Sequence, residues 1–254
     1  MAMCVNPTIV ENVTDNAVEC IVTDKRLLGT LPTPEQPFAI IKYGPTGSGK
    51  GSPVVQKEIE ALGVKLADCA VFEIDSIVES IRNYREKTYK VKTNFNEKTK
   101  LNINTRRNSN RKKHFYNELS SIYFGARRGI DPHFDNVLFG ALDTKKHIIF
   151  ETTGTNFNGR GPLEWIIDEI TKRKVYKIVV IYPLVEASIL KKRVEARGEQ
   201  QASSSKPEEN RFYRGIDPDT LPELANNSKM NLTHFVLPNV FVKKIHKLIV
   251  VWNQ

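Results

Sequence analysis

Cysteines and long apolar runs are both scarce in this sequence of 254 residues. The three cysteines (Cys4, Cys20 and Cys69) are widely spaced and odd in number, which argues against a disulfide framework or a zinc site and suits a reducing compartment. No apolar run approaches the length of about 18 residues that a membrane-spanning helix needs. The first residues also lack the basic start and apolar core of a secretion signal. These absences favour a cytoplasmic protein with no membrane contact.

Positive charge is plentiful, and it is gathered in one segment. The chain carries a net charge of +9, which favours an anionic partner such as a nucleotide, a nucleic acid or an anionic surface. Residues 82–128 contain fourteen lysines and arginines against three glutamates, a net charge of +11, whereas the other 207 residues sum to −2. The excess charge therefore belongs to this segment rather than to the fold as a whole.

Short apolar runs alternate with helical patterns over most of the chain. Helices of about ten to fifteen residues that alternate with buried strands are typical of βαβ units. Buried strands are expected over residues 37–44, 65–75, 146–154, 176–183 and 243–253. The pattern predicts a three-layer α/β fold with a mainly parallel five-stranded sheet and helices on both faces. Ligands of such a fold bind at the carboxyl ends of the strands.

The main domain is expected over residues 37–254, after an N-terminal extension at 1–36 that contains two short apolar runs. Residues 84–112 form a basic insertion that is rich in asparagine and poor in apolar periodicity, so a loop without regular structure is expected there. Residues 198–216 are polar and rich in serine, as expected for a lid segment.

A glycine-rich segment follows the first expected strand and opens a helix. It matches the pattern G-x-x-x-x-G-K, except that Gly51 replaces the usual serine or threonine and Ser52 comes next. Its backbone N–H groups and the helix dipole can bind a phosphate. Lys50 can reach the β- and γ-phosphates of a nucleotide, and the Ser52 hydroxyl can be a ligand of Mg²⁺. The candidate nucleotide-binding residues are Gly44, Thr46, Gly47, Ser48, Gly49, Lys50, Gly51 and Ser52.

This segment resembles the phosphate loop of adenylate kinases and related small P-loop kinases. In those enzymes too, glycine follows the lysine and a serine or threonine comes one residue later. The resemblance extends over about residues 37–215, with the loop as its specific part. It implies an ATP donor, Mg²⁺ and phosphoryl transfer, with Lys50 as a catalytic residue.

Acidic residues stand at the expected carboxyl ends of two further strands. Asp75, at the end of the second, is suited to accept the proton of an attacking hydroxyl, or alternatively to cap the next helix. Glu151, at the end of the third, is placed to hold Mg²⁺ or its water shell, or alternatively to serve the turn that follows. Thr152, Thr153 and Arg160 come next and are candidates to bind the substrate.

These strand ends resemble those of the zeta-toxin-like kinases, which carry aspartate after the second strand and an E-[ST]-T-like motif after the third. The aromatic-Pro-Arg motif that adenylate kinases carry after the third strand is absent. The resemblance implies phosphorylation of a hydroxyl group on a nucleotide sugar. It also implies that Asp75 is the base-like residue and that Glu151 and Thr153 face the substrate.

Four arginines are candidates for a lid. Arg193 and Arg197 lie four residues apart and share a helix face, and Arg211 and Arg214 follow the serine-rich stretch. Small P-loop kinases resemble this arrangement, which implies that these arginines neutralise charge on the transferred phosphoryl group, with Arg193 at the nucleotide and Arg197 in catalysis. The alternative is a solvated basic helix face.

Aromatic residues are interleaved with the cations of segment 82–128. This composition suits single-stranded nucleic acid, an anionic small-molecule acceptor, or simply a solvated loop. We therefore expect an ATP-dependent phosphotransferase that acts on a hydroxyl of a nucleotide-sugar or nucleotide-like acceptor. The alternatives are a polynucleotide 5′-hydroxyl kinase or a nucleoside monophosphate kinase. A nucleotide-hydrolysing switch protein is a second alternative, but the N-K-x-D-like base motif of switch GTPases is absent.

Overall fold

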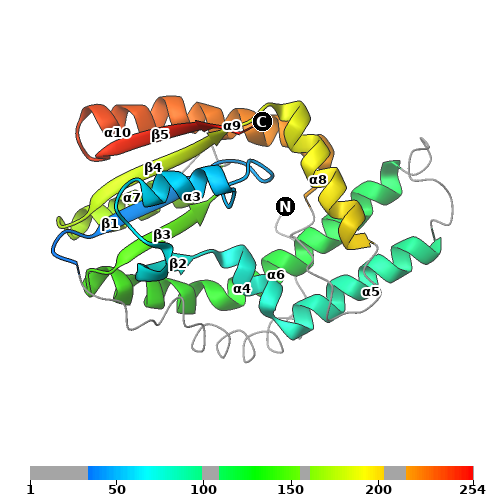
Figure 1. Ribbon diagram of the computed structural model, residues 1–254. Coiled ribbons are helices and arrows are strands. Elements are labelled where there is room, and N and C mark those ends of the chain that lie inside the picture. Colours follow the sequence, from blue (N-terminus) through cyan, green and yellow to red (C-terminus); the bar gives the residue numbers. More distant parts are fainter. Residues whose placement is uncertain (1–33, 99–108, 155–160, 203–215, 254) are drawn as a thin grey trace. The chain divides into compact units, whose positions relative to one another are not determined.

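Five parallel strands form one sheet in the order β2-β3-β1-β4-β5 (Figure 1). The computed structural model describes residues 34–98, 109–154, 161–202 and 216–253. The strands are β1 (Phe38–Tyr43), β2 (Cys69–Phe72), β3 (His147–Thr152), β4 (Lys177–Leu184) and β5 (Lys247–Trp252). The predicted α/β class and the parallel five-stranded sheet are thus confirmed. The apolar runs of the N-terminal extension lie outside the described residues.

The helices belong to two structural units. The sheet unit comprises Asp24–Glu73, Asn136–Val194 and Asp219–Gln254, and the described residues of the helical unit lie within Ile74–Asp135 and Glu195–Pro218. Within the described ranges no helix is both long and apolar enough to cross a membrane. The α-helices are α3 (Pro53–Glu60), α4 (Ile74–Ser80), α5 (Arg82–Lys98), α6 (Ser109–Asp143), α7 (Pro162–Lys172), α8 (Ala187–Ala202), α9 (Leu221–Asn231) and α10 (Leu237–Phe241).

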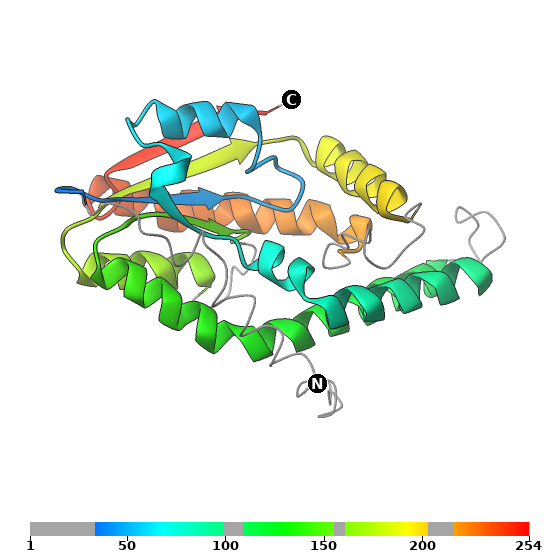
Figure 2. The ribbon, with the colours of Figure 1, turned by 60° about the horizontal axis from the view of Figure 1, so that its bottom comes forward.

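The inner strands of the sheet are buried on both faces, as is general in parallel sheets, whereas the edge strand β5 is partly exposed. Side chains alternate along each strand, so Ile40, Ile149 and Val179 point to one face, where Val55 and Ile59 of α3 pack against them. The opposite face carries Tyr43, whose hydroxyl donates a hydrogen bond to the backbone carbonyl of Ser228 in α9. Figure 2 shows α3 and α9 on opposite sides of the strands. This sandwich fixes the strand ends, from which the candidate site is built.

The basic insertion is helical where the structure describes it, so the loop predicted over 84–112 is wrong for its described part. Helix α5 runs through Lys98, and α6 begins at Ser109. Val91 of α5 packs against Leu119 of α6, and the rings of Phe95 and Phe115 stack with their centroids 4.3 Å apart. A sparse apolar stripe is therefore enough to pair two otherwise polar helices.

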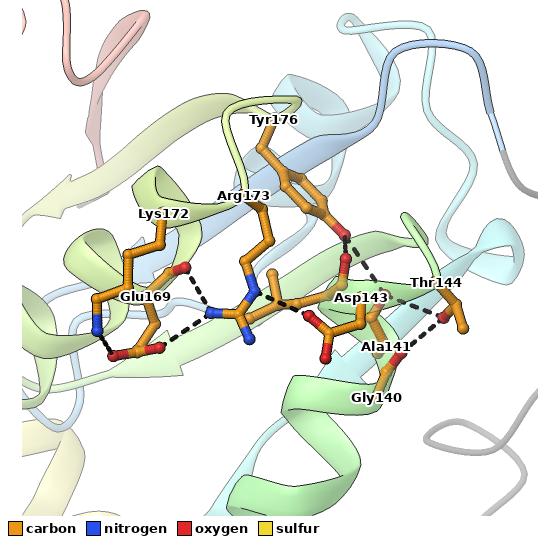
Figure 3. Close-up of polar contacts among 9 residues, drawn as sticks. Gly140, Ala141, Asp143, Thr144, Glu169, Lys172, Arg173 and Tyr176 are labelled. Carbon is orange, nitrogen blue, oxygen red and sulfur yellow. Dashed lines mark hydrogen bonds and ion pairs between the residues drawn. The ribbon is translucent and has the colours of Figure 1, made fainter.

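An ion-pair network ties together the ends of two helices in the sheet unit (Figure 3). Arg173, directly after α7, pairs with Asp143 at 3.1 Å and with Glu169 at 2.9 Å, and it also donates to the Glu169 backbone carbonyl. Nearby, the Tyr176 hydroxyl donates to the backbone carbonyl of Leu142. Burial raises the pKa of Tyr176, which therefore stays protonated and remains a donor. These contacts lie at the amino ends of β3 and β4, away from the candidate site.

Two histidines cap the starts of neighbouring strands. Nδ1 of His147 accepts a hydrogen bond from the Phe38 backbone N–H at 2.9 Å, and Nδ1 of His246 accepts one from the Ile178 backbone N–H at 3.1 Å. An imidazole can accept such a bond only while that nitrogen is unprotonated. Burial lowers the pKa of His147, against a smaller opposing effect of Asp68.

We expect the free energy of unfolding to fall as the pH drops below about 6.5, where a histidine in an unfolded chain becomes protonated. Folded His147 takes up its proton at a lower pH, so the unfolded state binds more protons in this window and is favoured. Urea unfolding between pH 5 and pH 8 would measure the effect. The His147→Asn variant, which keeps an acceptor but does not titrate, should show a flatter profile. An unchanged profile would contradict this role.

Candidate functional site

The candidate site lies where the chain changes direction across the sheet. From β1 the chain passes to β2, returns to β3 beside β1, and then places β4 and β5 on the other side of β1. Such a switch point opens a crevice at the carboxyl ends of the strands. Residues 44–52 connect the end of β1 to α3, so the predicted strand–loop–helix arrangement of the phosphate loop is present.

The loop depends on glycines for its backbone conformation. Gly47 and Gly49 have φ angles of +83° and +81°, in the left-handed region that favours glycine. Gly51 differs, because a Cβ atom built there would meet nothing within 4 Å. The Lys50 ammonium folds back over the loop and donates to the carbonyls of Gly44 at 2.9 Å and Pro45 at 3.3 Å.

Two hydroxyl groups of the loop are buried without a partner. The Oγ atoms of Ser48 and Ser52 have no hydrogen-bond partner among the described residues, and Ser52 precedes α3 without capping it. Buried polar groups in proteins usually have a hydrogen-bond partner. A hydroxyl without one at a phosphate loop is therefore well placed to bind a phosphate oxygen or a metal ion. The described residues contain no cluster of three or more metal-ligating side chains. A Mg²⁺ that is held largely by phosphate oxygens and water, with Ser52 and Glu151 as protein ligands, fits this donor set.

The lysine of the loop lies at one end of a row of four alternating charges. Lys42, on β1, lies directly beside Glu151 of β3 in the sheet register and pairs with it at 3.0 Å. Lys42 also pairs with Glu73, the residue after β2, while Lys50 lies 3.6 Å from Glu151. The structure thus brings together Lys50 and Glu151, two of the residues that the sequence singles out.

Lys42 and Glu73 were missed by the sequence analysis. Lys42 is only 6% exposed, in a strand whose other residues are apolar or aromatic, and this contrast is the signal that could have identified it. Burial lowers the pKa of Lys42, but Glu151 and Glu73 outweigh it, so the pKa ends above its ordinary value. Lys42 therefore stays charged and fixes both carboxylates at the strand ends.

Replacing Lys42 with methionine should destabilise the protein by about 3–5 kcal/mol, because two carboxylates would remain with no shared cation. Chemical denaturation of the wild type and Lys42→Met would measure the loss. The double variant Lys42→Met/Glu73→Gln should recover part of it, since one uncompensated charge is removed. A single variant as stable as the wild type would contradict the role of Lys42 as the shared counter-ion.

Asp75 occupies a different position from the one predicted. Strand β2 ends at Phe72, and Asp75 lies in the first turn of α4 rather than at the end of a strand. The chain turns into a helix early, at Ile74, because Ile77 and Val78 are buried on its inner face.

Inside the helical unit, Asp75 has a well-defined partner. The hydroxyl of Tyr123, a side chain only 1% exposed, donates a hydrogen bond to Asp75 Oδ1. Arg127 lies one turn further along α6 and pairs with Asp131 at 3.1 Å. Burial lowers the pKa of Arg127, but Tyr123, Asp131 and Asp75 together outweigh this effect, so the pKa lies above its ordinary value. The carboxylate of Asp75 is thereby held in one orientation beside a cation.

The remaining candidates fall into three groups. Arg193 of α8 donates from Nη1 to the Gly47 carbonyl at 3.2 Å, so it reaches the phosphate loop. Thr152 is buried and accepts a hydrogen bond from the Gly154 N–H, which is a turn contact, whereas Thr153 is half-buried. Of Arg197 the structure describes only its place in α8. Three further candidates lie outside the described residues, namely Arg160, Arg211 and Arg214.

The strand order and the glycine-rich loop after the central strand define the fold class, an α/β fold of the P-loop type. No protein-family model and no curated protein matches the chain. Among solved structures, the chain is similar to a protein of the PezAT chromosomal toxin–antitoxin system of the human pathogen Streptococcus pneumoniae. The TM-score is 0.53 at 9% identity, over 98% of this chain and 78% of that chain. The resemblance to zeta-toxin-like kinases is thus confirmed at the level of the fold.

Proposed function

We propose that the protein is an ATP-dependent phosphotransferase that transfers the γ-phosphate to a hydroxyl group of a nucleotide-sugar or nucleotide-like acceptor. The observation that carries this proposal is the phosphate loop with its lysine poised between loop carbonyls and Glu151. Fold similarity to a toxin–antitoxin protein supports it. The cytoplasm is the proposed compartment, because the cysteine pattern suits a reducing environment.

Lys50 would change partners when the nucleotide enters. Its contacts to the Gly44 and Pro45 carbonyls and to Glu151 are weaker competitors than the phosphate oxygens of a triphosphate, which carry more charge. Bound Mg²⁺ would neutralise charge on the β- and γ-phosphates. Glu151, held in place by its ion pair with Lys42, would orient the water shell of the Mg²⁺, and Ser52 would supply a hydroxyl ligand.

Asp75 would receive the proton of the acceptor hydroxyl. Tyr123 holds Oδ1 of the carboxylate, so the direction of the basic oxygens is fixed before the acceptor arrives. Arginines of α8 and of the proposed lid would neutralise charge on the transferred group and exclude water. We assign these roles to Arg193, Arg197, Arg211 and Arg214, with Thr153 and Arg160 at the acceptor.

An anionic small molecule is favoured over single-stranded nucleic acid as the acceptor. Stacking on bases requires exposed aromatic faces. Tyr84 is 1% exposed, whereas Phe95 and Phe115 stack on each other and the ring of Tyr116 meets Phe115 edge-on. The Phe95–Phe115 stack stabilises the pairing of α5 and α6, so these two rings are less available to bases. Phe124 of the same segment is 48% exposed, and the oligonucleotide panel described below tests whether it serves nucleic acid.

Incubation with γ-labelled ATP and separate panels of nucleotide sugars, nucleosides, nucleoside monophosphates and 5′-hydroxyl oligonucleotides tests the proposal. Label should appear on a nucleotide-type acceptor. Label on oligonucleotides would favour polynucleotide kinase activity, and label only in free phosphate would favour a nucleotide-hydrolysing switch.

In the same assay, Lys50→Ala should lower transfer by at least about 100-fold, because a cation that stabilises the transferring phosphoryl group is lost. Lys57→Ala removes an exposed lysine from the next helix and serves as the matched control, with transfer close to that of the wild type. Thermal unfolding of both variants would check that they fold. Undiminished turnover in a folded Lys50→Ala protein would refute the proposed mechanism.

Asp75→Asn should reduce transfer to a hydroxyl acceptor by about 100-fold or more, since general-base assistance is typically worth 10²–10⁴ in rate. Tyr123→Phe keeps the carboxylate but frees its orientation, so a smaller loss is expected. Rates at saturating ATP and acceptor would separate these effects from binding. Little effect of Asp75→Asn would point to a phosphate acceptor or to a role of Asp75 only at the start of α4.

A further inference from the structure

Asn253, which follows β5, contacts the phosphate loop from a distance of 205 residues along the chain. Its backbone N–H donates to the Leu184 carbonyl at the end of β4, at 3.1 Å. Its side-chain Nδ2 donates to the Ser48 carbonyl in the middle of the loop, at 2.8 Å. All of these residues belong to the sheet unit. The backbone bond anchors Asn253 to the sheet, and the side chain links that anchor to the loop.

The space for this contact exists because residue 49 has no side chain. A Cβ atom built on Gly49 would lie 2.0 Å from Asn253 Nδ2 and 3.6 Å from Nη1 of Arg193. Position 49 therefore requires glycine for two separate reasons: its φ angle is positive, and the side chain of Asn253 lies beside it. The asparagine amide occupies the volume that any other residue at position 49 would fill.

The hydrogen bond decides which way one peptide group of the loop points. In a planar trans peptide the C=O and N–H groups point in opposite directions. The Ser48 carbonyl is directed at Asn253, so the Gly49 N–H of the same peptide points away from it. Other loop carbonyls are also held by side chains, those of Gly44 and Pro45 by Lys50 and that of Gly47 by Arg193.

We propose that Asn253 is a positioning residue for nucleotide phosphates: it holds the Ser48–Gly49 peptide with its N–H toward the bound triphosphate. This proposal rests on the proposed function. Glycine adopts positive and negative φ angles with similar ease, so this peptide can rotate once its carbonyl is released. The rotated peptide would present its carbonyl oxygen to the phosphates and repel them. Asn253 prevents that rotation before the nucleotide arrives.

The test is the Asn253→Ala variant of the full chain, with dissociation constants measured for ATP and for inorganic tripolyphosphate. Both ligands should bind about tenfold more weakly, as expected for one lost hydrogen bond. Thermal unfolding should change little, because the backbone bond to Leu184 remains. Asn239→Ala is the matched control, since its side chain donates to the Phe235 carbonyl in the region of α10 and its removal should leave both constants unchanged.

Two further variants sharpen the result. Asn253→Asp has the same size but presents acceptor oxygens to the Ser48 carbonyl, so it should bind tripolyphosphate more weakly than Asn253→Ala does. Gly49→Ala should weaken binding less in the Asn253→Ala background than in the wild type, because the clash with Nδ2 is already gone. Equal losses in both backgrounds would overturn the proposal.

The outcomes separate this inference from the proposed function. A wild type that binds neither ATP nor tripolyphosphate overturns both. A wild type that binds both ligands, together with an Asn253→Ala variant of equal affinity, overturns the positioning role alone. A lower melting temperature with unchanged affinity also overturns it, because the contact would then serve stability only. A loss of affinity in Asn253→Ala that Asn239→Ala does not share supports it.

Discussion

A single buried ammonium group determines how the carboxyl edge of the sheet is built. Lys42 lies in the central strand, where an unpaired charge would be costly, and two carboxylates must therefore meet it. These come from the residue after β2 and from the penultimate residue of β3, so the charge pairing joins three adjacent strands at the same level. Glu151 in turn faces Lys50 of the phosphate loop. The loop's lysine is thus oriented by the same electrostatic arrangement that neutralises the core.

The sequence was most informative where local pattern and function coincide. Buried strands of a parallel sheet are continuous apolar runs, and a glycine-rich loop between strand and helix has its own signature, so both were predictable. The sequence predicted that Lys50 and Glu151 lie at the same edge of the sheet, but their ion pair appears only in the structure. Lys42 was not recognised although it is the one charged residue of an otherwise apolar strand, because the sequence does not show which carboxylates meet it. The position of Asp75 was predicted wrongly, because the hydrophobic run through Ile74 does not reveal where the strand ends and the helix begins.

Contacts between residues far apart in the sequence could not be predicted either, because local sequence patterns do not show which distant residues meet. Nothing in the residues near Asn253 indicates that its amide meets a carbonyl 205 positions earlier, since only the folded sheet brings them together. Helix α5 was missed for a different reason. Its buried positions include the polar residues Thr88 and Lys92, and Val91 and Phe95 contact residues of α6, so the local composition resembles that of an unstructured segment.

Gly51 bears on how this loop can evolve. Its position is where P-loop sequences commonly carry a hydroxyl, yet space around it is open and its backbone is not in the left-handed region. A serine there would meet no steric barrier, while Ser52 already offers an orphaned hydroxyl one residue later. Two neighbouring positions can therefore each carry the hydroxyl, and the chain can pass from one solution to the other through an intermediate that has both. Glycine at position 51 therefore leaves the loop with a hydroxyl one residue later.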